Sequence, residues 1–317
     1  ISLSKKVDNF EFSKKINIYT YEKYKNKYLN FLYCLSSVFF ERKIFSKNNI
    51  IHVHYIGFNG LISLILRTSN LVLTAWGNDI KSNQKNILKI FFLKILLKKS
   101  KIITTDSNEM KNLICEINQN LNDKVKLINF GIDTASFSKQ KYSLEIENKL
   151  KFQNFRNHLK IISLRNHEKI YDIKTLILSV KKLVDLNIKV VCLIYGNGSE
   201  TNNLKKLTTD LNLQKNIFFM GRYKQDELPY IFSILDCYVS TSLSDAGISA
   251  STAEAMSCEL SSISSNNSEN NLWIDHGKTG FLFENKNVDQ LTDILMNLKN
   301  FNLIKMGSES RKIILKK

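Results

Sequence analysis

The chain has 317 residues, of which 43% are apolar and 24% are charged. This balance excludes a wholly disordered chain or a fibrous repeat, and the length predicts two domains of roughly 150 residues each. The five cysteines include no CxxC pair, so they predict neither a disulfide framework nor a zinc site.

The formal net charge is +17, yet only six of the 46 basic residues are arginine. Arginine is the residue that most often reads bases through paired hydrogen bonds, so a lysine-rich chain argues against a nucleic-acid partner. Two interpretations of the charge stay open. One is a compositional drift toward lysine, and the other is attraction to an anionic membrane surface.

No segment predicts a membrane span. The longest apolar run, 87–97, contains Lys89 and Lys94 and is about half of the ~20 residues that a spanning helix needs. The opening stretch, 2–15, is polar without an apolar signal core, so we expect a cytoplasmic protein. The charge leaves open a peripheral position on the cytoplasmic face of the membrane. The chain begins with isoleucine, and we expect a piece to be missing before it.

Apolar runs alternate with helical patterns along nearly the whole chain, which is typical of parallel α/β units. In the first half, strands are predicted over 50–55, 71–75, 101–105 and 125–129. Helices are predicted over 28–45, 61–66, 87–98 and 107–117, with Ser107 as the cap of the last one. The alternation is lost in the polar stretch 133–159. We therefore expect two lobes, residues 1–145 and residues 146–317.

The second half repeats the alternation. Its predicted strands are 160–164, 188–195, 216–220, 236–240 and 260–264, and its predicted helices are 172–184, 199–212, 225–234, 250–258 and 287–299. Each half therefore predicts a Rossmann-like, doubly wound parallel sheet. In such sheets ligands lie outside the carboxyl ends of the strands, which here are the loops after Leu164, Tyr195, Met220, Ser240 and Ser264.

The loop after the first strand of the second half carries two cations, Arg165 and Lys169. Cations at the carboxyl end of a strand suit a phosphate-bearing ligand, although a merely solvated loop has the same composition. The next strand is followed by Gly196 and Gly198, which either permit close approach of the backbone to a ligand or make a tight turn.

The strongest signal lies in the segment 236–263. Asp245 follows an apolar strand, the small residues 246–249 open a helix, and Glu254 lies within that helix. Backbone N–H groups at a helix start suit a diphosphate, and a carboxylate further along can accept hydrogen bonds from a ribose diol. The alternative is that Asp245 caps the helix and Glu254 faces solvent.

The second half resembles the nucleotide-sugar-binding domain of the GT-B glycosyltransferases, in particular the retaining group 1 enzymes of family 4. The resemblance is carried by ISLR at 162–165, IYGNG at 194–198, IFFMGR at 217–222, DCYVS at 236–240, EAMSC at 254–258 and WIDHGKTGFL at 273–282. The first half is similar to that family's acceptor domain in IHVHY at 51–55, LTAWGNDI at 73–80 and NFGID at 129–133. About residues 50–300 are covered.

The resemblance implies a hexosyl-type glycosyltransferase. Such an enzyme moves a sugar, with retention, from a nucleoside diphosphate sugar to a glycan or lipid-linked acceptor in surface polysaccharide biosynthesis. The resemblance also implies that neither a metal ion nor another cofactor is needed.

Carried over residue by residue, the resemblance assigns roles to the residues already singled out. Arg165 and Lys169 would neutralise the diphosphate, Asp245 would contact the donor sugar, and Glu254 would hold the ribose. Arg165, Asp245 and Glu254 form the expected catalytic set. The remaining donor contacts would be Gly196, Gly198, Arg222, Tyr223, Gly247, Ile248 and Ser249, with Arg222 and Tyr223 near the base. The cleft would be faced from the acceptor side by His54, Gly77 and Asp79.

The chain departs from that family's pattern in several places. Eight residues rather than seven separate Asp245 from Glu254, and Tyr171 stands at the family's lysine position. Nothing before Ile50 resembles the family's opening strand and glycine-rich loop, and the chain stops at Lys317 before a helix that returns to the first lobe. We therefore expect truncation at both ends and a first lobe that lacks its first strand.

Two other functions stay open. The truncation and the altered spacing favour a non-catalytic or fragmentary relative that binds nucleotide without turnover. A peripheral membrane module would use the lysine-flanked helix 87–99. Apolar residues occupy nearly all faces of that helix, which is more typical of a buried element.

Overall fold

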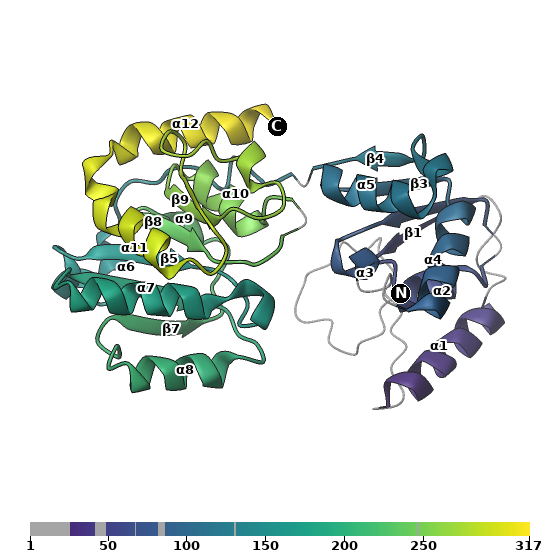
Figure 1. Cartoon of the computed structure of the whole chain (residues 1–317), viewed down its shortest axis with the longest axis horizontal. Helices are drawn as coiled ribbons and strands as arrows, with labels where there is room; N and C mark the ends of the chain where they lie inside the picture. Colours follow the sequence, from purple (N-terminus) through teal and green to yellow (C-terminus); the bar gives the residue numbers. More distant parts are fainter. Residues whose placement is uncertain (1–25, 42–48, 67, 82–85, 130, 246) are drawn as a thin grey trace. The chain divides into compact units, whose positions relative to one another are not determined.

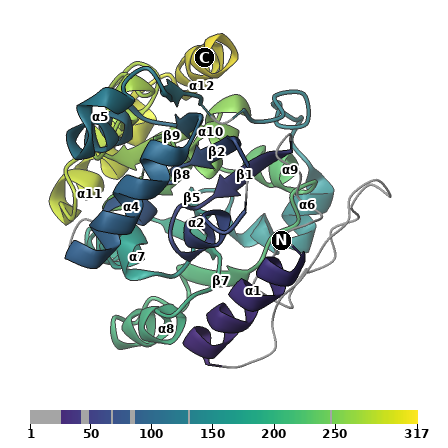
Figure 2. The same ribbon diagram turned by 90° about the vertical axis from the view of Figure 1, so that its right-hand side faces the viewer.

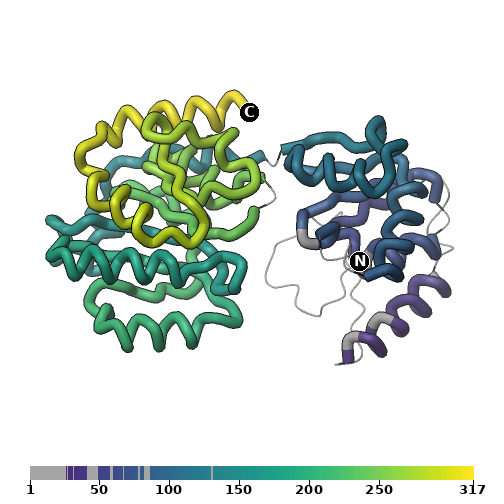
Figure 3. The backbone as a smooth tube through the Cα atoms, in the orientation of Figure 1, coloured from purple at the N-terminus to yellow at the C-terminus, as the bar shows by residue number. Residues whose placement is uncertain are grey.

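The computed structural model describes residues 26–41, 49–66, 68–81, 86–129, 131–245 and 247–317. The chain divides into two compact units, Ile1–Ile128 (unit 1) and Asn129–Lys317 (unit 2). Within the described ranges, no helix is long and apolar enough to cross a membrane. Figure 1 labels most of the elements of both units, and Figure 3 traces the backbone in the same orientation.

Unit 1 is built around a parallel sheet with the strand order β1-β2-β3-β4 (Figure 1). The strands are β1 (Ile50–His54), β2 (Asn70–Thr74), β3 (Ile102–Thr105) and β4 (Val125–Leu127). The helices are α1 (Lys27–Glu41), α2 (Phe58–Ser63), α3 (Asn78–Lys81), α4 (Ile87–Lys99) and α5 (Asn108–Ile117). Ser107 caps α5 as predicted, by accepting the N–H of Met110 at 3.3 Å. The expected lack of a first strand concerns residues before Ile50, most of which lie outside the described ranges.

Unit 2 contains a six-stranded parallel sheet with the order β10-β9-β8-β5-β6-β7. The strands are β5 (Leu159–Ser163), β6 (Val190–Tyr195), β7 (Ile217–Gly221), β8 (Cys237–Ser240), β9 (Ser261–Ser265) and β10 (Phe281–Phe283). Counted along the unit and from the β7 edge, this is the order 3-2-1-4-5-6 of dinucleotide-binding folds. The strands that follow β5 are added on one side of it up to β7, and those from β8 onward are added on the other side. The topological switch point therefore lies between β5 and β8, at their carboxyl ends.

Helices cover both faces of this sheet. They are α6 (Leu144–Lys149), α7 (Ile173–Asp185), α8 (Thr201–Asp210), α9 (Leu228–Phe232), α10 (Ala250–Ser257), α11 (Val288–Asn297) and α12 (Leu303–Lys316). Alternate strand residues face opposite layers: Ile161 and Cys192 pack with α7, α8 and α11, while Ile162 and Leu193 pack with α6 and α9. The predicted pair of Rossmann-like lobes is therefore confirmed.

The segment that follows unit 1 is tied into unit 2. Phe137 packs into the core layer that contains Ile162 and Leu193. The Arg311 guanidinium of α12 donates to the carbonyl oxygens of Phe137 at 3.0 Å and Thr134 at 3.1 Å, and also to that of Ser257. Residues 129–145, which the sequence analysis placed in the first lobe, thus lie with the second unit.

Candidate functional site

A buried ion pair occupies the switch point of unit 2. Arg165 follows β5, Asp245 follows β8, and a guanidinium nitrogen of Arg165 is bonded to a carboxylate oxygen of Asp245. The exposed fractions of the two side chains are only 10% and 9%. The structure therefore brings together two of the three predicted catalytic residues, which are 80 positions apart in the chain.

Other side chains hold the Arg165 guanidinium in place. The ring of Tyr171 lies 4.3 Å from its central carbon, and the hydroxyl of Ser251 lies 3.5 Å from a terminal nitrogen. Ser251 is in turn bonded to the hydroxyl of Tyr238 at 2.8 Å. The Nε–H of Arg165 is buried and has no hydrogen-bond partner among the described residues. A buried cation thus has one donor whose hydrogen bond is not made within the described part of the chain.

The Asp245 carboxylate stands in a low-dielectric environment. Burial raises its pKa, and the charge of Arg165 acts in the opposite direction. Its backbone is also fixed, because its N–H donates to the side-chain oxygen of Asn267 at 3.0 Å and its carbonyl accepts from Ser268. The carboxylate therefore has a defined position beside the guanidinium.

Ser249, rather than Asp245, is the N-cap of α10. Its hydroxyl accepts the N–H of Thr252 at 3.2 Å. The alternative in which Asp245 caps this helix is therefore wrong, and the Asp245 carboxylate is used on Arg165 instead. Gly247 is buried in the turn before the helix, while Ile248 and Ser249 are half-buried.

Glu254 points away from bulk solvent, since only 7% of the residue is exposed. Burial raises its pKa to about 7, although a hydrogen bond with the side chain of Gln225 acts in the opposite direction. Tyr223 is half-buried, and burial together with the Glu254 charge raises its pKa. The solvent-facing alternative for Glu254 is wrong, and Tyr223 lies close enough to sense its charge. Arg222 is exposed.

The two glycines after β6 are explained by packing. A Cβ atom at Gly196 would lie 2.5 Å from the carbonyl oxygen of Arg165, and one at Gly198 would lie 2.4 Å from that of His167. Gly196 also has a φ of +111°. His167 N–H donates to the carbonyl oxygen of Asn197 at 3.1 Å, which joins the two loops. The lack of a side chain at both glycines therefore lets the loop after β6 pack against the backbone of the loop that carries Arg165.

We expect Gly196→Ala to lower the free energy of unfolding by at least about 2 kcal/mol, because both its φ and its contact with backbone forbid a Cβ atom. Chemical denaturation measures the loss. Gly131→Ala is the matched control, since a Cβ atom there meets nothing within 4 Å, and it should change stability by less than about 0.5 kcal/mol. Equal losses for both variants would contradict the packing role of Gly196.

Lys169 is exposed and begins a short 3₁₀ helix, Lys169–Tyr171. Four residues without a predicted role position Arg165 and Asp245, namely Tyr171, Ser251, Tyr238 and Asn267. Tyr171 was visible as a departure from the family's lysine position, but the other three gave no signal. Among the described residues, no group of three or more His, Cys, Asp or Glu side chains could hold a metal ion.

The three predicted acceptor-side residues lie together at the carboxyl ends of β1 and β2 in unit 1. His54 is exposed and its ring lies 6.0 Å from that of Trp76, while Gly77 has a φ of +107°. Asp79 is 1% exposed and accepts the N–H groups of Ile56 at 2.8 Å and Trp76 at 3.0 Å. Asp79 therefore joins the two loops to one another.

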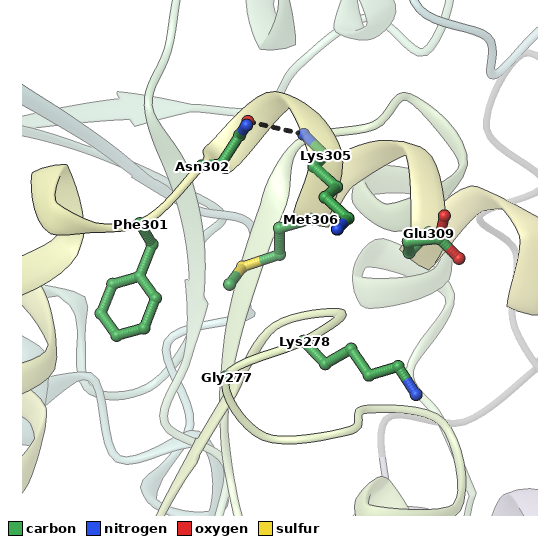
Figure 4. Close-up of a pocket in the computed structure, with 7 residues that line it drawn as sticks. All are labelled: Gly277, Lys278, Phe301, Asn302, Lys305, Met306 and Glu309. Carbon is green, nitrogen blue, oxygen red and sulfur yellow. Dashed lines mark hydrogen bonds between the residues drawn. The ribbon is translucent and has the colours of Figure 1, made fainter.

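A separate cavity of about 270 Å³ lies between the segment before β10 and the first turns of α12 (Figure 4). It is lined by residues before β10 and around the start of α12, namely Gly277, Lys278, Phe301, Asn302, Lys305, Met306 and Glu309. None of the predicted site residues is among them. The candidate site is thus defined by the ion pair and its neighbours at the carboxyl edge.

Two parallel α/β units, with a charged site at the switch point of the second, are the architecture of the GT-B glycosyltransferases. The crystal structure of Anabaena HepE in complex with UDP-glucose is similar over 95% of this chain and 81% of its own, with a TM-score of 0.72 and 16% identity. Sucrose-phosphate synthase of Thermosynechococcus elongatus is similar over 92% of this chain and 76% of its own, with a TM-score of 0.76 and 16% identity. The predicted GT-B fold is confirmed.

Residues 159–305 match the family of glycosyl transferases group 1. An uncharacterized glycosyltransferase of Methanocaldococcus jannaschii is 25% identical over 244 residues, which are 75% of this chain and 60% of that protein. UDP-Gal:alpha-D-GlcNAc-diphosphoundecaprenol alpha-1,3-galactosyltransferase of Escherichia coli is 30% identical over 121 residues, 38% of this chain and 30% of that enzyme. This segment of unit 2 is therefore similar to the group 1 glycosyl transferases, and the chain spans less than two thirds of the length of these two relatives.

Proposed function

We propose that this protein transfers a sugar from a nucleoside diphosphate sugar to a hydroxyl of a glycan or lipid-linked acceptor. The observation that carries the proposal is the Arg165 guanidinium, which is buried at the switch point with its Nε–H unpartnered among the described residues. The N-terminus of α10 and the buried Glu254 belong to the same part of the unit. A cation, helix N–H groups and a carboxylate match the diphosphate and ribose of such a donor.

In the proposed reaction, the bond between the sugar carbon and the diphosphate oxygen breaks, the acceptor oxygen bonds to the same carbon with retention, and the proton of the acceptor hydroxyl passes to the leaving diphosphate. Negative charge develops on the leaving diphosphate. Arg165 and Lys169 would stabilise that charge together with the N–H groups of α10, so that no metal ion is required. Asp245 would hold a hydroxyl of the donor sugar, and Glu254 the ribose diol. Arg222 and Tyr223 would contact the base.

The kind of acceptor is also part of the proposal. The E. coli relative acts, by its name, on a diphosphoundecaprenol-linked sugar, and HepE was crystallised with UDP-glucose. These names support a hexosyl donor and a lipid-linked acceptor in surface polysaccharide synthesis, with His54, Gly77 and Asp79 on the acceptor side. The protein would act on the cytoplasmic face of a membrane.

The Asp245→Asn variant tests the proposed reaction. Asparagine removes the charge that competes for Arg165, so we expect binding of UDP or GDP to be retained or strengthened. Sugar transfer, or hydrolysis of UDP- and GDP-hexoses, should fall about 10–100-fold, the scale of one charge-assisted hydrogen bond. Calorimetry measures the binding, and release of the nucleotide measures turnover.

Asp275→Asn is the control, because Asp275 is an exposed carboxylate of the same unit that pairs with Lys278. It should leave both readouts unchanged. If the unaltered protein binds the nucleotide but turns over no donor, the non-catalytic alternative holds. If it binds no nucleoside diphosphate at all, the proposed function is wrong.

A further inference from the structure

Helix α4 exposes an apolar face to solvent. Five side chains, Ile87, Leu88, Phe91, Phe92 and Ile95, have exposed fractions between 38% and 86%. Their spacing of one, three and four positions places them on one side of a helix with 3.6 residues per turn. We call these five residues the outer face of α4. Contiguous exposed apolar side chains of this kind mark interaction surfaces rather than ordinary solvent-facing helix.

The helix is firmly held by its other side. Leu93, Leu96 and Leu97 are buried in the core of unit 1. Asn86 caps the first turn by accepting the N–H groups of Leu88 and Lys89, and the Lys99 ammonium donates to carbonyl oxygens at the end of α2. The sequence interpretation of this segment as a buried helix is thus right for one side and wrong for the outer face. The outer face is preformed.

Cations border the outer face. Lys94 and Lys98 are exposed and follow Phe91 and Ile95 by three positions, so each lies beside the apolar stripe. Figure 2 shows α4 and α1 on the same side of unit 1, and α2 is in contact with both helices. Helix α1 also carries strongly exposed apolar side chains, including Tyr28 and Phe40. Exposed apolar side chains therefore occur on two helices of unit 1.

We propose that the outer face of α4 docks on an anionic lipid surface. An apolar stripe with lysines at its border is the pattern of helices that lie in the interface of a bilayer, with aromatic rings among the acyl chains and ammonium groups at the phosphates. The helix has 13 residues, which is too short to span a bilayer but sufficient to lie along one. The net charge of +17 favours an anionic partner over a second copy of this chain, whose own lysines would face these. This inference rests on the membrane position given in the proposed function, but it concerns unit 1, whereas the proposed donor site lies in unit 2.

Co-sedimentation of the full chain with vesicles tests the docking. We expect binding to phosphatidylcholine vesicles that contain phosphatidylglycerol, weaker binding to phosphatidylcholine alone, and a loss of binding as salt is raised. The double variant Leu88→Gln/Phe91→Gln should bind the anionic vesicles at least about tenfold more weakly, because it removes two large apolar side chains from the outer face. Both positions are exposed, so the variant should melt like the unaltered protein.

The control removes equally exposed apolar side chains from another helix. Leu88 and Phe91 are 70% and 58% exposed, and Ile304 and Leu315 of α12 are 75% and 58% exposed. Ile304→Gln/Leu315→Gln should therefore retain vesicle binding if the site is α4. Equal losses in the two double variants would show that general hydrophobicity, not this face, drives the binding, and would overturn the proposal.

Substitution of the bordering lysines, Lys94 and Lys98, provides an independent test of the docking. Lys94→Gln/Lys98→Gln should weaken binding to anionic vesicles about tenfold and reduce its salt dependence, whereas Lys206→Gln/Lys215→Gln in unit 2 should not. Absence of vesicle binding by the unaltered protein would overturn the proposal. So would a change of oligomeric state in the Leu88→Gln/Phe91→Gln variant without any lipid binding, since the face would then join two copies. Nucleotide binding is unaffected in every arm, which separates this test from that of the proposed function.

Discussion

Replacing Arg165 by alanine is expected to lower both stability and nucleotide affinity more than any other single change in unit 2. The change leaves the Asp245 carboxylate buried without its partner, which costs about 3–5 kcal/mol in the free energy of unfolding. It also removes the proposed charge-assisted hydrogen bonds to the diphosphate, worth about 1.5–3 kcal/mol of binding. Denaturation and calorimetry with UDP or GDP measure the two effects.

The two effects are separated by a second substitution. In Arg165→Ala/Asp245→Asn neither charge of the buried pair remains, so most of the lost stability should return, whereas the affinity for the nucleotide should stay low. If affinity returns with stability, the guanidinium acts only as the partner of Asp245 and does not bind the donor. An unchanged affinity in a folded Arg165→Ala variant leads to the same conclusion.

Glu254→Gln is expected to stabilise the protein at pH 8 while it weakens ribonucleotide binding. Burial raises the pKa of Glu254 to about 7, above the value of about 4.5 that it has when unfolded. The contribution of this carboxyl to stability is therefore full below about pH 4.5 and is lost as the pH rises through about 7. Glutamine avoids that loss, so the variant should gain about 2 kcal/mol at pH 8 and less than about 1 kcal/mol at pH 5.

The binding readout tests the ribose role of the same side chain. An ionised carboxylate accepts hydrogen bonds from both ribose hydroxyls, so nucleotide affinity of the unaltered protein should rise as the pH passes about 7. A 2′,3′-dideoxy nucleotide should show no such rise and should lose little affinity in Glu254→Gln. Equal losses for the ribose and dideoxy ligands would remove Glu254 from the ribose site. A stability gain that does not depend on pH would contradict the raised pKa.

Apolar periodicity was sufficient to predict both sheets and most of their helices. β6 is buried along its whole length, and such a run is easily read as a strand. β10, with three residues, and α6, in a polar stretch, were missed because each depends on packing supplied from elsewhere in unit 2. α12 was missed as well, although Met306 and Ile314 give it a buried side.

The candidate site was predictable in its residue types but not in its internal contacts. Strand ends and helix starts located Arg165, Asp245 and Glu254, because the carboxyl edge of a parallel sheet gathers them. That Arg165 and Asp245 pair with each other follows from the placement of β5 beside β8, which a linear pattern does not contain. The burial of Glu254 likewise depends on side chains such as Tyr223 from another loop.

The contacts of Arg311 determine where unit 2 can be separated from unit 1 by truncation. This guanidinium joins α12 to the carbonyl oxygens of Thr134 and Phe137, and Phe137 itself fills part of the core. A fragment that starts at residue 146 lacks Phe137 and so has a cavity in that core. The half-buried Arg311 guanidinium also loses its hydrogen bonds to the carbonyl oxygens of Thr134 and Phe137. A fragment that starts at residue 129 keeps these hydrogen bonds and the packing of Phe137. Truncation at that position therefore removes unit 1 and leaves the core contacts of unit 2 intact.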